Sequence, residues 1–211
     1  ISHDLKTPLT LVIDPLKQLD SLIPMDAPYR SYVELISKNV VRIQHMISQL
    51  LKFRQIETLK VPLDCKPGDI IKFVDNIFSL FEFYAGKHHI ETEFISQMES
   101  FDTRFDYDVI EKVFTNLFSN AIKYTTENGY VSVRVGRAAQ EEIQDTGAPA
   151  GAEWLSFVVT NSGEGIPKEN VGTLFEPFNN HGTVKTGFGT HTGLGLAIVK
   201  ELVKDMKGSI S

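Results

Sequence analysis

Two segments near the start of the chain carry apolar residues at alternating intervals of three and four positions. They are Leu5, Leu9, Val12, Leu16, Leu19 and Ile23 in the first segment, and Val33, Ile36, Val40, Ile43, Ile47 and Leu50 in the second. This spacing is the heptad pattern of helices that pack along a narrow apolar seam. The polar segment 24–30 predicts a short turn, so the two helices should form an antiparallel hairpin.

A single hairpin of this kind cannot cover both of its apolar seams. Pairing with a second copy of the chain into a four-helix bundle would bury them, and we therefore expect a homodimer. The alternative is a hairpin that packs against the rest of its own chain.

After residue 59 the heptad pattern stops, and the segment 61–69 (VPLDCKPGD) has the prolines and glycine of a linker. The pattern beyond it predicts helices at 70–85, 105–124 and 193–206, and strands at 89–95, 130–135, 154–160 and, cut short, 207–211. The small and polar segment 137–153 should be an exposed hairpin insert. Helices and strands segregated in this way predict an α+β layer, with domains at 1–59 and 60–211.

The formal net charge of −6 argues against a nucleic-acid or anionic-membrane surface, since both need an excess of Lys and Arg. A phosphorylated ligand would therefore be held by backbone N–H groups, a helix N-terminus or a divalent cation. Cys65 is the single cysteine, which excludes an internal disulfide and fits a reducing compartment. No apolar run approaches the ~20 residues that span a bilayer. The chain lacks an initiating Met and starts within a pattern, so we expect a fragment of a longer protein.

His3 falls at a solvent-facing heptad position, with Asp4 beside it and Thr7 one helical turn further on. A carboxylate next to an imidazole can orient the ring while one ring nitrogen attacks an electrophile. Pro8 cannot donate a backbone hydrogen bond and crowds the preceding turn, which predicts a bend just below the histidine. An exposed histidine on a helix is ordinary, so its role depends on what lies downstream.

Residues 2–9, SHDLKTPL, closely resemble the H box of bacterial sensor histidine kinases. Four further segments resemble the other boxes of that family, in the family's order. They are the N box NLFSNAIKYT (116–125), the G1 box NSGEGIP (161–167), the F box LFEPF (174–178) and the G2 box TGFGTHTGLGLAIVK (186–200). The resemblance implies a dimerisation and phosphotransfer hairpin, followed by a two-layer α+β sandwich with a mixed sheet, of the Bergerat type shared with gyrase-like ATPases.

The resemblance also implies a site for ATP and Mg²⁺. Asn116 and Asn120 share a helix face with Lys123, and amide oxygens are suitable ligands for Mg²⁺. In the family the residue matching Asn120 holds Mg²⁺, while Lys123 would meet phosphate and Tyr124 would lie near the base. The G2 glycines precede a helix whose backbone N–H groups would face the phosphates. The other residues implied to contact the nucleotide are Asn161, Gly163, Gly165, Ile166, Phe178, Gly189, Thr190, Gly193, Leu194, Gly195 and Leu196.

The sequence departs from the family at the start of the G1 box, where Asn161 stands in place of the usual Asp. The Asp of the family accepts a hydrogen bond from the adenine amino group, and an amide oxygen can still accept it. Exchanging a charge-assisted bond for a neutral one costs on the order of 1 kcal/mol. We therefore expect weaker ATP binding or looser base selection rather than loss of function.

The function implied by the resemblance is ATP-dependent autophosphorylation of His3, followed by transfer to an Asp of a response-regulator receiver domain. Asp4 would act as base or orienter, and Thr7 would orient a water that hydrolyses the regulator's phospho-aspartate. We expect this portion to be cytoplasmic, without direct membrane contact, in a protein anchored in the bacterial inner membrane. The receiver domain belongs to a separate chain or, as in hybrid sensor kinases, to the same one.

Two other functions compete with this one. A degenerate kinase, which binds ATP or partners without transferring phosphate, is favoured by Asn161 alone. A conformational ATPase of the Bergerat type would use an acid on the helix to activate water, and the matching residue is Asn116, which cannot serve as a base. The sequence therefore favours transfer to histidine over hydrolysis.

Overall fold

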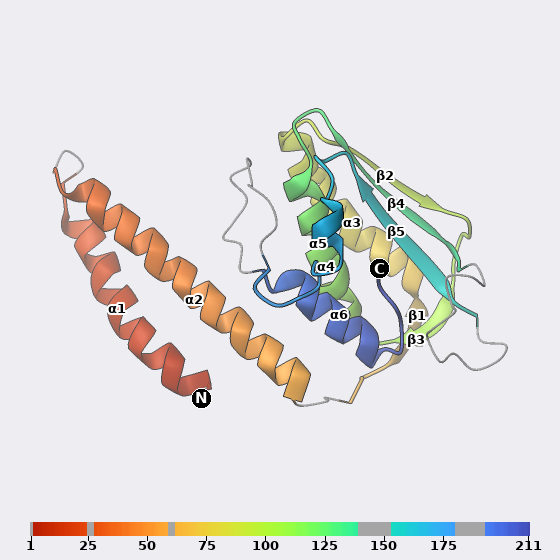
Figure 1. Cartoon of the computed structure of the whole chain (residues 1–211), viewed down its shortest axis with the longest axis horizontal. Helices are drawn as coiled ribbons and strands as arrows, with labels where there is room; N and C mark the ends of the chain where they lie inside the picture. Colours follow the sequence, from red (N-terminus) through yellow and green to blue (C-terminus); the bar gives the residue numbers. More distant parts are fainter. Residues whose placement is uncertain (1, 25–27, 59–61, 139–152, 180–192) are drawn as a thin grey trace.

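The computed structural model describes residues 2–24, 28–58, 62–138, 153–179 and 193–211 (Figure 1). For 2–11 and for positions 42, 45, 49, 52, 53 and 55–58 it describes the backbone alone. The chain begins with two long helices, α1 (Ser2–Leu22) and α2 (Arg30–Thr58), which pack side by side as the predicted hairpin. Helix α1 is continuous through Pro8. None of the described helices is long and apolar enough to cross a lipid bilayer.

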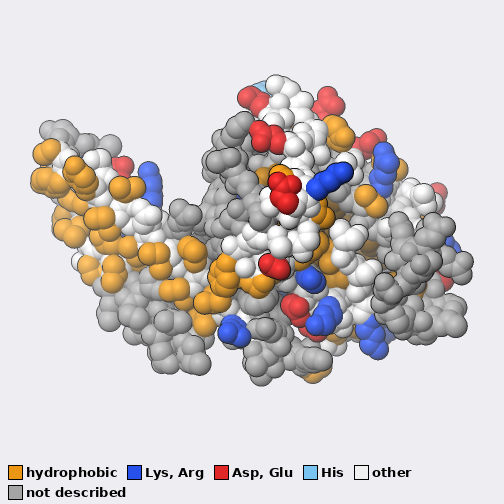
Figure 2. All heavy atoms as spheres, in the orientation of Figure 1, with side chains coloured by type: hydrophobic (Ala, Val, Ile, Leu, Met, Phe, Trp, Pro, Cys, Tyr) orange, Lys and Arg blue, Asp and Glu red, His pale blue; other side chains and the backbone are white. Residues whose placement is uncertain are grey.

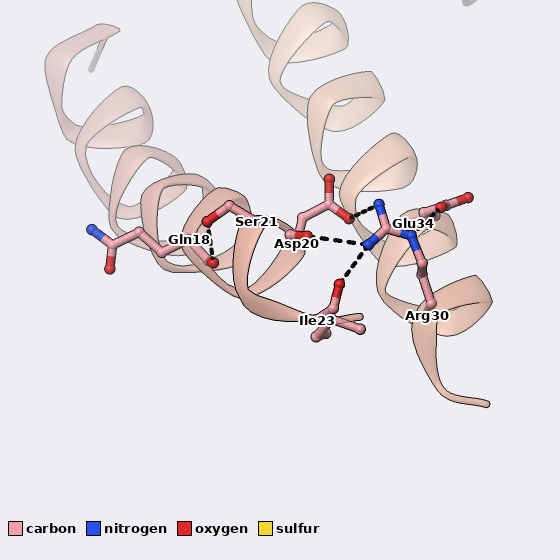
Figure 3. Close-up of polar contacts among 6 residues, drawn as sticks. All are labelled: Gln18, Asp20, Ser21, Ile23, Arg30 and Glu34. Atoms are coloured by element: carbon pink, nitrogen blue, oxygen red, sulfur yellow. Dashed lines mark hydrogen bonds and ion pairs between the residues drawn. The ribbon is translucent and has the colours of Figure 1, made fainter. Parts of the chain in front are cut away.

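The turn between α1 and α2 is held by Arg30, the first residue of α2 (Figure 3). Its Nη1 donates to the backbone carbonyl of Ile23 at 2.7 Å, and its Nε pairs with Glu34 Oε1 at 3.0 Å. Its Nη2 lies 3.7 Å from Asp20 Oδ1, near the end of α1. Because the last carbonyls of a helix lack intrahelical partners, a guanidinium from the next helix satisfies them and ties the two helix ends together.

The hairpin buries only part of its apolar surface within the single chain. Ile13 is buried, whereas the seam residues Val12 and Leu19 are each 49% exposed. Near the other end of the hairpin, Leu50 packs against the core of the following α+β unit, and α2 contacts α6 (Gly195–Asp205). Hydrophobic side chains still line the visible face of the hairpin in Figure 2. Packing on the rest of its own chain therefore covers part of the hairpin and leaves much of the seam exposed.

The second unit is a three-stranded mixed sheet with helices on one face (Figure 1). Its strand order is β2 (Glu91–Ser96), β4 (Tyr130–Arg137) and β5 (Leu155–Asn161); β4 is parallel to β2 and antiparallel to β5. The covering helices are α3 (Ile70–Lys87), α4 (Tyr107–Tyr124) and α6, while α5 (Lys168–Val171) is a short turn of helix after β5. The two-layer α+β fold with a mixed sheet is thus confirmed.

The core forms where the inward residues of β4 meet the apolar sides of α3 and α4. Val131, Val133 and Val135 alternate along β4 and are fully buried, as the period of a strand requires. On the helices, the buried rings of Phe78 and Phe118 meet edge to face with centroids 5.1 Å apart. This geometry contributes about 0.5–1.5 kcal/mol beyond the apolar area that the rings bury.

The two long helices of this unit begin at the aspartates that cap them. Asp69 accepts hydrogen bonds from the N–H groups of Ile71 and Lys72 at 3.1 and 3.3 Å. Burial opposes ionisation of Asp69, but the hydrogen bonds from Phe101 and Lys72 outweigh it and lower the pKa of the carboxyl. Asp106 caps α4 by accepting from the Val109 N–H at 3.1 Å.

The segment 61–69, expected to be a linker, contains a strand. Lys66–Asp69 forms β1 and pairs antiparallel with β3 (Asp102–Phe105), which the sequence did not predict, so α4 begins after Phe105 instead of including it. Pro67 and Gly68 gave the segment the composition of a loop, yet proline is tolerated in edge strands. The Tyr107 hydroxyl bonds to the Pro67 carbonyl at 3.1 Å and occupies the space that a Cβ at Gly68 would take.

The chain end also differs from the expectation of a strand at 207–211, because none of these described residues lies in a strand. Lys207 adopts a left-handed φ of 61°, and the N–H of Gly208 donates to the carbonyl of Val203 at 2.8 Å. These two features close the C-terminus of α6 in the manner of a helix-terminating turn. Of the expected insert at 137–153, positions 139–152 lie outside the described residues.

Candidate functional site

The start of α6 lies directly against the middle of α4. A Cβ at Gly195, the first residue of α6, would lie 2.9 Å from Asn116 Oδ1 and 4.0 Å from Asn120 Nδ2. Asn116 is held from its other end, because its Nδ2 donates to the Lys112 carbonyl at 2.7 Å. The predicted N-box amides and the end of the predicted G2 box therefore meet in space, although about 75 residues separate them in the sequence.

Lys123, in the last turn of α4, is a buried cation near the C-terminus of that helix. Its side chain is 8% exposed; the Nζ donates to Tyr124 Oη at 2.8 Å and lies 4.1 Å from the centre of that ring. Burial lowers the pKa of Lys123 to about 8 and raises the pKa of the Tyr124 hydroxyl. An ammonium that has lost much of its hydration gains more from an approaching anion than an exposed one does.

The predicted G1 loop follows β5 and is tied to the end of α4 by a bridge between Thr125 and Gly163. A Cβ at Gly163 would overlap the backbone carbonyl oxygen of Tyr124 and would lie 2.8 Å from Asn161 Nδ2. This close approach admits only glycine at position 163, and it places the Asn161 side chain near the backbone of Tyr124. Gly165 has a left-handed φ of 78°, and the neighbouring Ile166 side chain is half exposed.

The residues that flank 180–192 meet each other. The N–H of Phe178 donates to the carbonyl of Gly193 at 3.0 Å, and the Phe178 side chain is half exposed. Leu194 is fully buried in the core, so any contact of this residue with a nucleotide runs through its backbone. Among the described residues, Leu194 at the N-cap of α6 provides no side-chain cap, and Leu196 follows as a half-buried residue of the first turn.

Some predicted site residues lie outside what the structure describes. Gly189 and Thr190 fall in 180–192, and the side chains of His3, Asp4 and Thr7 are not described, although their backbone lies in the first turns of α1. The structure thus brings together the N-box residues, the G1 loop, Phe178 and the start of α6. How these groups lie relative to the His3 imidazole falls outside what the structure describes.

Sequence reasoning missed two polar residues that shape the site. Thr125 is fully buried, and its Oγ1 donates to the Ala121 carbonyl at 2.7 Å while its backbone bridges to Gly163. Ser162 Oγ accepts from the Tyr130 N–H at 2.7 Å, which fixes the G1 loop to the start of β4. The available signal was their placement: each is a small hydroxyl residue inside a predicted box, directly after the end of a regular element.

The donor set fits a nucleotide with a magnesium ion better than a metal held by the protein alone. Within the described ranges, no group of three or more His, Cys, Asp or Glu side chains could hold a metal. The polar groups that meet are the two amides of α4 and the start of α6, and the buried Lys123 follows Asn120 by one turn of α4. Such a set suits Mg²⁺, which takes few protein ligands and completes its shell with waters and phosphate oxygens.

Comparison with known proteins identifies the family. Residues 105–211 match the family described as "Histidine kinase-, DNA gyrase B-, and HSP90-like ATPase", and residues 1–59 match the "His Kinase A (phospho-acceptor) domain". The chain belongs to the sensor histidine kinases. The ATP-binding family that the resemblance implied is therefore confirmed for the second unit, and the phospho-acceptor family for the hairpin.

Individual relatives agree with this assignment. The histidine kinase is 28% identical to histidine kinase P4 of Formosa agariphila and 29% identical to sensor histidine kinase WalK of Bacillus subtilis, in both cases over its whole length. It spans 15% of the first relative and 33% of the second. Among solved structures, it is similar to full-length ShkA in complex with AMPPNP, with 25% identity and a TM-score of 0.70 over 97% of this chain and 40% of that one. The catalytic domain of ThkA superposes with 26% identity and a TM-score of 0.54, over 68% of this chain and 82% of that one.

Proposed function

We propose that this histidine kinase transfers the γ-phosphoryl group of ATP to His3 and then to an Asp of a response-regulator receiver domain. The observation that carries the proposal is the close approach of Gly195, at the start of α6, to the amides of Asn116 and Asn120 on α4. These groups are preceded in the same chain by a matched phospho-acceptor hairpin. The AMPPNP complex of the similar ShkA kinase supports a nucleotide at this place.

Each group at the site would have a distinct task. Asn116 and the first N–H groups of α6 would bind phosphate oxygens, and the ammonium of Lys123 would offset their charge. Asn161 and Tyr124 would face the adenine, held close to each other by the bridge between Thr125 and Gly163. Asn120 would be a ligand of Mg²⁺, which neutralises phosphate charge when it is bound.

At the hairpin, a neutral imidazole nitrogen of His3 would form the N–P bond as the bond from the γ-phosphorus to its bridging oxygen breaks, with ADP as the leaving group. Asp4 would orient the ring or accept its proton. Positioning and charge neutralisation supply most of the catalysis in such a transfer. Thr7 would orient the water that hydrolyses the regulator's phospho-aspartate.

The working unit in this proposal is a homodimer with domains at 1–59 and 60–211. The end of α2 at Thr58 and the start of β1 at Lys66 support this division. Exposed large apolar residues on both hairpin helices support the dimer, since a second hairpin would cover them. The sensor kinases among the relatives support a place for the chain on the cytoplasmic side of a membrane-anchored sensor.

Incubation with γ-labelled ATP and Mg²⁺ tests the proposal, with His3→Gln as the matched variant. We expect alkali-stable, acid-labile label on the wild type and none on His3→Gln, while both bind ATP equally. Equal labelling of the two proteins would remove His3 as the acceptor. Release of free phosphate without any labelling would instead favour the conformational ATPase.

A further inference from the structure

Two left-handed residues face each other where the segments flanking 180–192 meet. Phe178 has a φ of 65° and Gly193 a φ of 66°. For glycine this conformation is unstrained, but for phenylalanine it is unfavourable and persists only when neighbouring contacts hold it. One such contact is the hydrogen bond from the Phe178 N–H to the Gly193 carbonyl, at 3.0 Å.

The backbone of Asn179 packs directly on Gly193. A Cβ at Gly193 would lie 2.9 Å from both the nitrogen and the oxygen of Asn179, and 2.7 Å from the carbonyl carbon of Phe178. No real Cβ tolerates such distances from backbone atoms. The two backbone segments are therefore in van der Waals contact, and a shift of Asn179 displaces Gly193.

The side chain of Asn179 ties this contact to the turn after α5. Its Nδ2 donates to the Thr173 carbonyl at 2.9 Å, and the same carbonyl accepts the Glu176 N–H at 3.0 Å. The backbone N–H of Asn179 points back to the Glu176 carbonyl at 3.4 Å. Of these two hydrogen bonds donated by Asn179, the one from the side-chain amide is the shorter.

We infer that Asn179 is a positioning residue for nucleotide binding, which acts through Gly193 on the contact between Gly195 and Asn116. Only Leu194 separates Gly193 from Gly195, the first residue of α6, so the backbone direction at Gly193 sets how the first N–H groups of α6 are aimed. When the bond to Thr173 is removed, the unfavourable φ of Phe178 relaxes and the two backbones separate. This inference rests on the proposed function, because it assigns the start of α6 to ATP.

Asn179→Ala removes the donor, and Asn179→Asp keeps the shape but turns an oxygen toward the Thr173 carbonyl. Asn170→Asp is the matched control: it makes the same charge change in α5, where Asn170 contacts Thr173 through its backbone carbonyl. We expect ATP to bind about fivefold more weakly to Asn179→Ala, and more weakly still to Asn179→Asp, as befits loss of one partly buried hydrogen bond. Asn170→Asp should bind like the wild type.

The measurements are the equilibrium affinity for ATP·Mg²⁺, the KM and kcat of autophosphorylation, and the unfolding midpoint without nucleotide. A positioning role raises Kd and KM while kcat at saturating ATP and the midpoint stay near wild type; a purely structural role lowers the midpoint and leaves Kd unchanged. Unchanged affinity in both Asn179 variants would overturn the inference. If the wild type binds ATP but does not label His3, the proposed function fails while the affinities still decide the role of Asn179; a wild type that binds no ATP overturns both.

Discussion

The ammonium of Lys123 donates a hydrogen bond to the hydroxyl of Tyr124 at 2.8 Å and lies 4.1 Å from the centre of the same ring. The lysine is 8% exposed, and this burial lowers its pKa to about 8. A cation in this condition is present at neutral pH and is lost in mildly alkaline solution. The proposed nucleotide site therefore carries its own sensitivity to pH.

The affinity for ATP should fall as the pH rises through the pKa of Lys123. Below about pH 7.5 the lysine is protonated and the affinity should be constant; from pH 7 to pH 9 we expect Kd to rise by about tenfold. Lys123→Arg, whose guanidinium stays charged, should flatten this profile. Titration calorimetry at a series of pH values measures it, and equal profiles for the two proteins would contradict the assignment of Lys123 to phosphate.

The lowered pKa of Lys123 also affects the stability of the fold. Stability should rise with pH, whereas ATP affinity should fall. Between the folded value of about 8 and the ordinary value of 10.5, the unfolded chain holds a proton on Lys123 that the folded chain has lost. The free energy of unfolding contributed by this residue therefore rises with pH across that window. Denaturant unfolding at pH 7.5 and pH 9.5 should show that the free energy of unfolding of the wild type, measured relative to that of Lys123→Met, is greater at the higher pH.

Gly195 and Gly163 offer a pair of alanine substitutions with different consequences. At Gly195 a Cβ would meet Asn116 Oδ1, the end of a half-buried side chain that can rotate away only by giving up its bond to the Lys112 carbonyl, so the fold should lose about 1 kcal/mol while ATP affinity falls. At Gly163 the Cβ would overlap the Tyr124 backbone carbonyl, and we expect a loss of about 2 kcal/mol or more. Urea unfolding and ATP titration separate the two effects. Equal destabilisation by both would contradict the packing described here.

Asn161→Asp should strengthen ATP binding by several-fold, because a carboxylate accepts a hydrogen bond more strongly than an amide oxygen does. The amide nitrogen of Asn161 lies on the side of Gly163, so the exchange also changes a contact within the loop. Comparing the affinities of the two proteins for ATP and GTP measures both strength and base selection. If the Asp variant binds ATP no better, the reasoning about this residue is wrong.

Arg30→Gln should loosen the turn of the hairpin. The substitution removes the ion pairs to Asp20 and Glu34 and the bond to the Ile23 carbonyl, all partly shielded from solvent. We expect the free energy of unfolding to fall by about 1–2 kcal/mol. Lys38→Gln, at an exposed position of α2, is the charge-matched control and should change it little. Circular dichroism during urea titration measures both.

The elements that the sequence predicted well are those with a local signal. The heptads of α1 and α2, and the cap Asp69 before α3, each specify structure within a few residues. Strands β1 and β3 were missed because their evidence is a pairing across about 36 residues, and Pro67 and Gly68 disguise one partner as a loop. A short pattern cannot reveal such a pairing.

The same distinction between local signals and contacts of the folded chain applies to the candidate site. The order of the boxes along the chain predicted which glycines and amides would be near one another, and Gly195 does lie against Asn116. The tie from Asn179 to the Thr173 carbonyl and the bridge from Thr125 to Gly163 involve backbone atoms, which any residue type possesses. Asn179 and Gly163 are visible in the sequence, but which backbone atoms they meet depends on the folded path of the chain.

The central claim is that the phosphoryl group of ATP is transferred to the imidazole of His3. Tandem mass spectrometry of the peptide containing residue 3, prepared at alkaline pH after incubation with ATP·Mg²⁺, tests it most directly. We predict a single phosphoryl group on His3 that is absent from Asn120→Ala, which lacks the side chain proposed to bind Mg²⁺. A phosphoryl group on Ser2 or Thr7 instead, or an unmodified peptide from a wild type that binds ATP and dimerises, would contradict the account.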